Sequence, residues 1–92
     1  MAYIMARMEV PDYDEWKRER FDADPAGRAQ TGKGHRIFRN VDNPNEVIVQ
    51  VEFSSAEDAK SFRERLRESA ALEGLKLPAP PAIVEEAESV TY

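Results

Sequence analysis

The feature that most constrains the fold is the segment 34–53, GHRIFRNVDNPNEVIVQVEF, in which two runs of alternating apolar and polar residues flank an Asn-Pro-Asn sequence. Alternation with a period of two is typical of strands that bury one face. Proline fixes φ and asparagine side chains hydrogen-bond to the nearby backbone. We therefore expect a hairpin whose connecting loop runs from Asp42 to Glu46.

The register of this hairpin is predicted from where the apolar residues collect. A shift by one residue would place His35 opposite Glu52 and scatter the valines over both faces, so it is the less favoured alternative. The favoured register collects the apolar side chains on one face of the sheet. Its opposed pairs are Val41 with Val47, Arg39 with Val49, Ile37 with Val51 and His35 with Phe53.

The residues before the hairpin predict a strand and then a helix. The segment from Tyr3 to Val10 alternates as a half-buried strand does. Asp12 and Glu15 have the spacing of a capping box, so a helix is expected to begin there and to end at residues 24–27, Asp-Pro-Ala-Gly. The polar residues from Arg28 to Lys33 are expected to form a flexible, functional loop.

A second helix is predicted after the hairpin. Ser54 with Glu57, or Ser55 with Asp58, offers a second capping box. Apolar residues at helical spacing then extend the helix to about Glu68.

The rest of the chain predicts one more strand. Residues 69–73 either continue the helix or form a separate turn. Three prolines in residues 75–81 remove backbone donors and helical freedom, so an extended crossover is expected. Residues 82–90 contain β-branched side chains around an acidic middle, and we expect them to form the last strand.

The resulting order, β-α-β-β-α-β, predicts the α+β class and the ferredoxin-like fold, with both helices on one face of a four-stranded antiparallel sheet. The other face of that sheet is too apolar to be left in water and too polar for a monomer core. We therefore expect a second copy of the chain to cover it, giving a homodimer. This face carries Tyr3, Met5, Arg7, Arg36, Phe38, Asn40, Ile48, Gln50 and Glu52.

Length and composition limit the classes of function. The 92 residues fit one domain, residues 1–92, and the net charge of −5 argues against nucleic acid and anionic membranes as partners. The chain has no cysteine, which excludes disulfides and thiolate chemistry. No membrane span or leader is recognisable, so the cytoplasm is the expected location.

Three stretches give the chain a family resemblance: DYDEWK (12–17), FRNVDNPNEVIV (38–49) and FSSAEDAKSF (53–62). With the initial strand, they resemble the antibiotic-biosynthesis-monooxygenase-like group of the dimeric α/β-barrel superfamily. The resemblance covers nearly the whole chain. It implies two ferredoxin-like subunits that appose their sheets to form a barrel.

The resemblance also implies an activity, the oxidation of a polycyclic phenol without metal or flavin. The family places an asparagine, a tryptophan and a tyrosine around the substrate, and Asn40, Trp16 and Tyr13 are of these types, outside any shared motif. The superfamily also contains isomerases and haem-degrading enzymes. Because the haem-degrading branch needs an iron-ligating histidine on the second helix and residues 55–73 contain none, haem is not expected.

His35 is the candidate catalytic residue, because it is the only side chain whose ordinary pKa lies near neutrality. The alternative is a strand-end histidine that only hydrogen-bonds locally. Arg39 is a candidate holder of a carboxylate or phenolate in the substrate. It could equally pair with Asp42 or Glu46 beside the turn, and this alternative is favoured.

Tyr13, Trp16 and Phe62 are candidate substrate-binding residues, because with Phe21 and Ile37 they could form an aromatic pocket for a flat ligand. The alternative is an ordinary hydrophobic core.

No metal or cofactor is expected. One histidine with scattered carboxylates gives no metal-ligand spacing. Glu85, Glu86 and Glu88 could bind calcium weakly, but strand alternation places Glu85 on the opposite face from the other two, so a solvated or interface strand is expected. Gly32-Lys33-Gly34 lacks the pattern of a phosphate-binding loop.

Two hypotheses of function follow. The first is a homodimeric barrel protein that binds a small apolar or aromatic molecule; if it is an enzyme, cofactor-independent oxygenation or a related isomerisation is the expected reaction. The second is a non-catalytic dimeric module whose pocket is filled by its own side chains.

Overall fold

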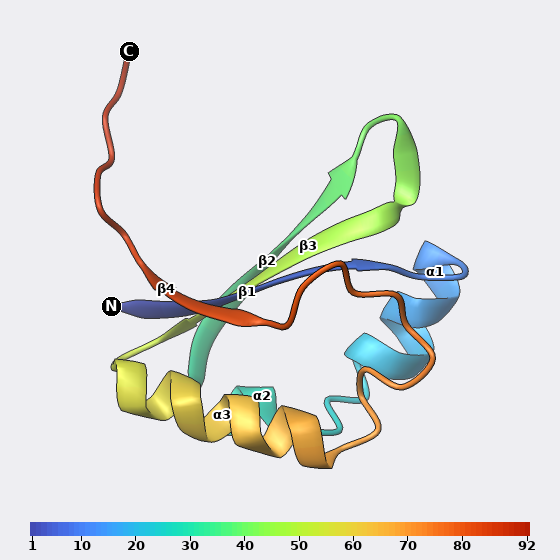
Figure 1. The fold of residues 1–92 in the computed structure, drawn as a ribbon, viewed down its shortest axis with the longest axis horizontal. Coiled ribbons are helices and arrows are strands. Elements are labelled where there is room, and N and C mark those ends of the chain that lie inside the picture. The colour runs from blue at the N-terminus through green and yellow to red at the C-terminus, as the bar shows by residue number, and fades with distance from the viewer.

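One four-stranded antiparallel sheet forms the centre of the computed structural model, which describes residues 1–92. The strands are β1 (Ala2–Glu9), β2 (Gly32–Asn40), β3 (Asn43–Phe53) and β4 (Ala82–Glu85), in the spatial order β2-β3-β1-β4 (Figure 1). This is the order of a split βαβ arrangement, because the first strand lies between the third and the fourth. The predicted ferredoxin-like fold is confirmed.

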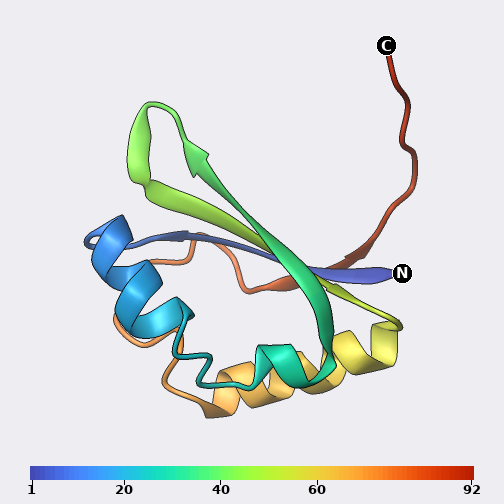
Figure 2. The ribbon, with the colours of Figure 1, turned by 180° about the vertical axis from the view of Figure 1, so that it is seen from behind.

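The helices lie on one face of the sheet, as Figure 2 also shows from behind. They are α1 (Tyr13–Trp16), the π-helical η1 (Lys17–Phe21), α2 (Arg28–Thr31) and α3 (Ala56–Glu68). Because η1 follows α1 without a break, the predicted first helix is present, with its second half wound more widely than an α-helix.

Both predicted helix starts are confirmed by their caps. The Asp12 side chain accepts a hydrogen bond from the backbone N–H of Glu15 at 3.0 Å. The Ser55 Oγ accepts one from the backbone N–H of Asp58 at 3.2 Å, so the second of the two proposed capping pairs is the one that forms. Such caps satisfy backbone donors that the first turn leaves free.

The hydrophobic core lies between the sheet and the helices. Alternate residues of β1 and β3 point into it, which is the pattern that the sequence predicts. No polar or charged residue is fully buried. The core consists of Ala2, Ile4, Ala6, Met8, Val10, Trp16, Ala26, Val47, Val49, Val51, Phe53, Ala59 and Phe62.

The predicted hairpin register is wrong by two residues. His35 lies opposite Val51, Ile37 opposite Val49 and Arg39 opposite Val47. The one-residue shift does not occur either. A displacement by two preserves which side chains face the core, because the side-chain period of a strand is also two.

The register differs because the turn is tighter than the expected Asp42–Glu46 loop. Asn40 pairs with Asn43, and the Asn40 Oδ1 accepts the backbone N–H of Asp42 at 2.8 Å. Val41 therefore stands at the tip of the turn, 95% exposed, instead of opposite Val47. The asparagine that directs the turn is Asn40, before the proline-containing sequence.

The expected Arg28–Lys33 loop is also wrong, because this segment forms α2 and the start of β2. The Asp24 carboxylate accepts the backbone N–H of Arg28 at 2.6 Å and that of Ala29 at 3.0 Å. Gly27 precedes α2 with a φ of 70°, a conformation that glycine adopts without strain. These local bonds support a helix of one turn.

The last strand is shorter than the predicted range 82–90. β4 pairs with β1 from Met5↔Ala82 to Ala2↔Glu85. Only Met1 precedes Ala2, so β1 offers almost no partner for residues beyond Glu85. Residues 86–92 are exposed and lead away from the body of the molecule (Figures 1 and 2). Residues 69–74 form turns, and the crossover that follows pairs once with β1, through Lys76 and Glu9.

The face of the sheet that the helices leave open carries exposed apolar side chains. Phe38 is 48% exposed and Val84 is 37% exposed, and Tyr3, Met5 and Ile48 are half-buried. A broad open depression of about 610 Å³ crosses this face, lined mostly by polar groups such as Arg36, Gln50 and Glu52. We call this helix-free side of the sheet, which includes the depression, the open face of the sheet.

Candidate functional site

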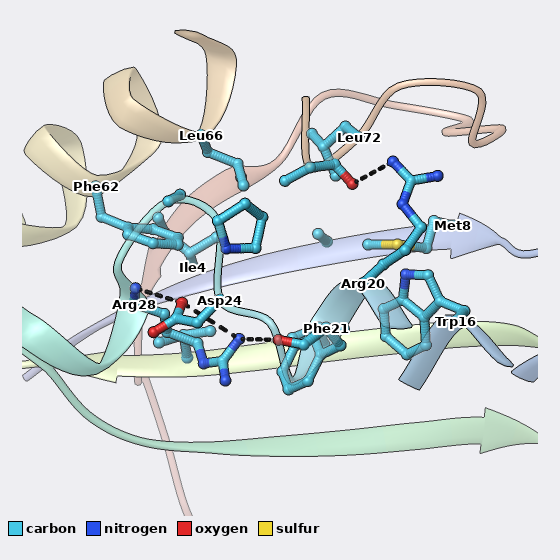
Figure 3. A pocket seen from close by; sticks show the side chains of 16 residues that line it. Ile4, Met8, Trp16, Arg20, Phe21, Asp24, Arg28, Phe62, Leu66 and Leu72 are labelled. Atoms are coloured by element: carbon cyan, nitrogen blue, oxygen red, sulfur yellow. Dashed lines mark hydrogen bonds and ion pairs between the residues drawn. The ribbon is translucent and has the colours of Figure 1, made fainter. Parts of the chain in front are cut away.

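A cavity of about 70 Å³ lies between the sheet and the helices (Figure 3). Twelve of its 16 lining residues are hydrophobic. An engineered apolar cavity of about 150 Å³ holds benzene, so this one is roughly half the size that a single ring occupies. The wall consists of Ile4, Ala6, Met8, Trp16, Arg20, Phe21, Asp24, Pro25, Ala26, Arg28, Val49, Val51, Phe62, Leu66, Ala71 and Leu72.

Two of the predicted ligand-binding residues, Trp16 and Phe62, line this cavity. Each is 5% exposed. The Trp16 ring centroid is 5.2 Å from that of Phe21, and the Phe62 centroid is 5.4 Å from that of Phe53. Both rings are therefore held by aromatic neighbours and form firm parts of the wall.

The other three candidates, His35, Arg39 and Tyr13, lie outside the cavity wall, beside the edge strand β2. The Arg39 Cζ lies 4.1 Å from the Tyr13 ring centroid, a cation–π contact. The Tyr13 ring also packs near the Trp16 ring, with 5.9 Å between the two centroids. At the other end, the His35 ring meets Phe21 edge to face at 5.0 Å.

Arg39 pairs with neither Asp42 nor Glu46, although the sequence favoured that pairing. The Arg39 Nε donates to the Pro44 carbonyl oxygen at 3.0 Å. Glu46 instead forms an ion pair with Arg7 of β1. The shifted register accounts for this, because it brings Arg39 opposite Val47 and beside the Tyr13 ring.

His35 is mostly exposed, on the side of β2 that faces Phe21. Partial desolvation lowers its pKa from the ordinary value of 6.5, and the nearby positive charges of Arg28 and Lys17 lower it further. The negative charges of Asp22 and Asp24 act in the opposite direction and raise it. The imidazole is therefore neutral at pH 7 and able to accept a proton.

The sequence did not assign the polar part of the cavity wall, which is made by Arg20, Asp24 and Arg28. Arg20 Nη2 donates to the backbone carbonyl oxygens of Ala70 and Ala71, at 2.8 and 3.0 Å. This ties η1 to the turn after α3 (Figure 3). At helical spacing Arg20 falls on the same side of its helix as Tyr13 and Trp16, and this is the sequence signal that could have found it.

Arg28 had no such signal, because it was expected in a loop. Its guanidinium carbon lies 3.9 Å from the Phe21 ring centroid, and Nη1 donates to the Phe21 carbonyl oxygen at 3.3 Å. The Asp24 carboxylate is 3.8 Å from Nη1. The Arg28 side chain is only 15% exposed, so this cation is largely withdrawn from water at the cavity wall.

No group of three potential metal-ligating histidine, cysteine, aspartate or glutamate residues lies together in the structure. Nor does it contain a helix with the length and apolar character needed to cross a bilayer.

Comparison with known proteins connects this architecture to solved structures. No protein-family profile matches the chain, and no curated protein matches it by sequence. A candidate antibiotic biosynthesis monooxygenase from Deinococcus radiodurans superposes with a TM-score of 0.63 at 7% identity, over 100% of this chain and 98% of that one. This chain therefore shares the fold of that protein.

Another protein with this fold is Rv0793 from Mycobacterium tuberculosis. It superposes with a TM-score of 0.52 at 17% identity, over 95% of this chain and 98% of that one. At such identities the likeness establishes the fold alone, because one fold carries many functions. The predicted resemblance to the antibiotic-biosynthesis-monooxygenase-like group is confirmed at that level.

Proposed function

We propose that the chain forms a homodimeric α/β barrel and binds a small, largely apolar molecule in the cavity between its sheet and its helices. The cavity is the observation that carries the proposal. It is lined by 12 hydrophobic residues and only a few polar ones, which is typical of sites for small molecules. Trp16 and Phe62 would form the aromatic walls.

We further propose that the reaction is oxygenation without a cofactor. The likeness in fold to a candidate antibiotic biosynthesis monooxygenase supports this reaction class. In such a reaction a deprotonated substrate gives electrons to O₂; one oxygen atom becomes a carbonyl of the product and the other leaves as water. Because the cavity is small, single-ring phenols are better candidates than polycyclic ones.

His35 is the proposed base in this reaction. Its lowered pKa keeps the imidazole neutral at pH 7. Phe21 contacts His35 and also lines the cavity, so a substrate would reach the imidazole by displacing the Phe21 ring. Arg39 and Tyr13 would contact only a ligand that extends from the cavity past Trp16.

An oxygen electrode tests the reaction. With phenol or 3-methylphenol as substrate, the protein should consume O₂ faster than buffer, and His35→Ala should lose this activity while it keeps its fold and its association state. Unchanged consumption in His35→Ala removes His35 from the mechanism. No consumption by the parent protein with either phenol contradicts the proposed oxygenation.

The second candidate function is a non-catalytic dimeric module whose own side chains fill the pocket. The observation that favours it is the volume of about 70 Å³, below that of a cavity known to hold a ring. Ligand binding separates the two candidates, because the module should bind no apolar molecule at this place.

Phenol titrated into ¹⁵N-labelled protein provides that test. Binding in the cavity should give saturating shifts of the amides of Phe62 and Leu72. Ala71→Leu should abolish them by filling the cavity, whereas Ala70→Leu, at an exposed neighbour outside the wall, should leave them intact. The absence of saturating shifts in the parent protein favours the module.

The proposed dimer rests on the open face of the sheet. Exposed apolar side chains gathered on one face are typical of an interaction surface, and aromatic residues with paired polar groups suit the core of an interface. We expect a dimer at micromolar concentration in sedimentation velocity. Phe38→Arg should yield a monomer, whereas Val41→Arg, at the tip of the turn and away from this face, should remain a dimer. A monomeric parent protein would contradict the proposed dimer.

A further inference from the structure

The polar groups of the cavity wall carry unequal charges. Arg20 and Arg28 are the two cations among the 16 lining residues, and Asp24 is the one anion. Two positive charges against one negative charge leave one positive charge in excess. The other lining residues carry no charge, so nothing else in the wall compensates it.

Asp24 offsets one of the two positive charges, and both of its oxygens accept hydrogen bonds from the backbone of α2. Oδ1 accepts the backbone N–H of Arg28 at 2.6 Å, and Oδ2 accepts that of Ala29 at 3.0 Å. The distance from Oδ1 to the Arg28 Nη1 is 3.8 Å, beyond a hydrogen bond. The carboxylate thus caps α2 more than it pairs with the guanidinium.

The Arg28 guanidinium also keeps donors free. It has five N–H donors, and within the chain its side chain makes one hydrogen bond, from Nη1 to the Phe21 carbonyl oxygen at 3.3 Å. Its flat face rests on the Phe21 ring, which holds the plane of the group in position. Arg20, across the cavity wall, donates through Nη2 to two backbone carbonyls and retains its other donors.

We infer that the natural ligand of this cavity is a small apolar monoanion, a carboxylate or a phenolate, whose negative group is held by Arg28, while Arg20 in the same wall adds a second positive charge. This rests on the proposed function and names the class of molecule that the same cavity takes. A planar anion matches the guanidinium fork, and a group with little access to water strengthens the charged hydrogen bond.

The field around the neighbouring residues supports the inference. Burial lowers the pKa of His35, and the charges of Arg28 and Lys17 lower it further, whereas those of Asp22 and Asp24 raise it. The excess positive charge of the cavity wall contrasts with the net charge of −5 for the whole chain. Attraction of an anion therefore depends on the close guanidinium groups and not on the overall field.

The experiment compares benzoate with benzamide, which has the same shape and no charge. Titrations of the full chain, followed by ¹⁵N amide shifts at pH 7, should give benzoate an affinity at least about tenfold higher, the value of one charged hydrogen bond. Equal affinity for the two leaves the proposed apolar cavity intact and overturns the anion inference. Binding of neither molecule contradicts both proposals.

Charge-matched variants locate the effect. Arg28→Gln should weaken benzoate about tenfold and leave benzamide unchanged, and Arg28→Lys should restore part of the loss. Arg18→Gln removes the same charge from an exposed side chain of η1 that is 70% accessible, so it should leave both affinities unchanged. A loss in Arg18→Gln equal to that in Arg28→Gln overturns the inference, because the general field would then account for it.

If Arg28→Gln loses its fold by circular dichroism, Arg20→Gln provides the second variant. It should weaken benzoate more than benzamide, and equal weakening of the two overturns the inference.

Discussion

Filling the cavity should stabilise the protein. Ala71 lines the cavity and has no positive φ that would resist a larger side chain. Ala71→Leu adds three carbon atoms, each worth about 0.8 kcal/mol when buried, and ordering the longer side chain costs about 0.5–1 kcal/mol. The expected gain in the free energy of unfolding is therefore about 1.5 kcal/mol.

The gain is measurable by calorimetry and by urea unfolding. For a domain of this size, 1 kcal/mol shifts Tm by about 4–8 °C, so Ala71→Leu should raise Tm by about 6–12 °C. Its urea midpoint should rise while the dependence of unfolding free energy on urea stays constant, because the surface exposed on unfolding hardly changes.

Ala70→Leu is the matched control. Ala70 is exposed and does not line the cavity, so its effect should stay within about 0.5 kcal/mol. A fall in Tm for Ala71→Leu, or an equal rise in both variants, refutes the reasoning. The first result means that no usable space exists beside Ala71, and the second that the gain does not come from the cavity.

Three further predictions concern local structure. A Cβ on Gly32 would lie 2.7 Å from the Arg28 carbonyl oxygen, so Gly32→Ala should lower the free energy of unfolding by about 1–3 kcal/mol. Gly34 has open space around it, so Gly34→Ala should lower it far less, and equal losses of Tm in the two variants would contradict this. Ser55→Ala should remove the α3 cap and cost about 1 kcal/mol in urea unfolding, and Ser54→Ala should not. Because folding lowers the pKa of His35, the unfolded chain binds more protons, and the free energy of unfolding should fall as pH drops below about 6.5. His35→Gln should flatten that part of the curve of unfolding free energy against pH, and an unaltered curve would refute the assignment.

The faces of the sheet could be predicted from the sequence, because strand alternation assigns each side chain to one face whatever the exact pairing. Val47, Val49, Val51 and Phe53 are all buried as expected. The pairing itself could not be predicted in the same way. A register two residues away turns the same side chains toward the core, apart from Val41 at the turn, so the hydrophobic pattern hardly distinguishes the two. The observed register is accompanied by the hydrogen bond from the Asp42 N–H to the Asn40 Oδ1.

The candidate site was less predictable, because it depends on contacts between segments distant in sequence. Helical spacing placed Trp16 and Phe62 on inward faces, and both line the cavity. Arg28 could not be assigned, because α2 is a single turn that exists through the Asp24 cap and has no apolar periodicity of its own. The length of β4 likewise depends on where β1 begins to pair, at Ala2.

The most direct test of the proposed ligand site is a nuclear Overhauser spectrum of ¹³C-labelled protein with unlabelled phenol. If the cavity between the sheet and the helices is the binding site, phenol protons should show contacts to the side chains of Phe62, Leu66 and Leu72. Contacts only to Met5 and Ile48 on the open face of the sheet, or no contacts at saturating phenol, would contradict it.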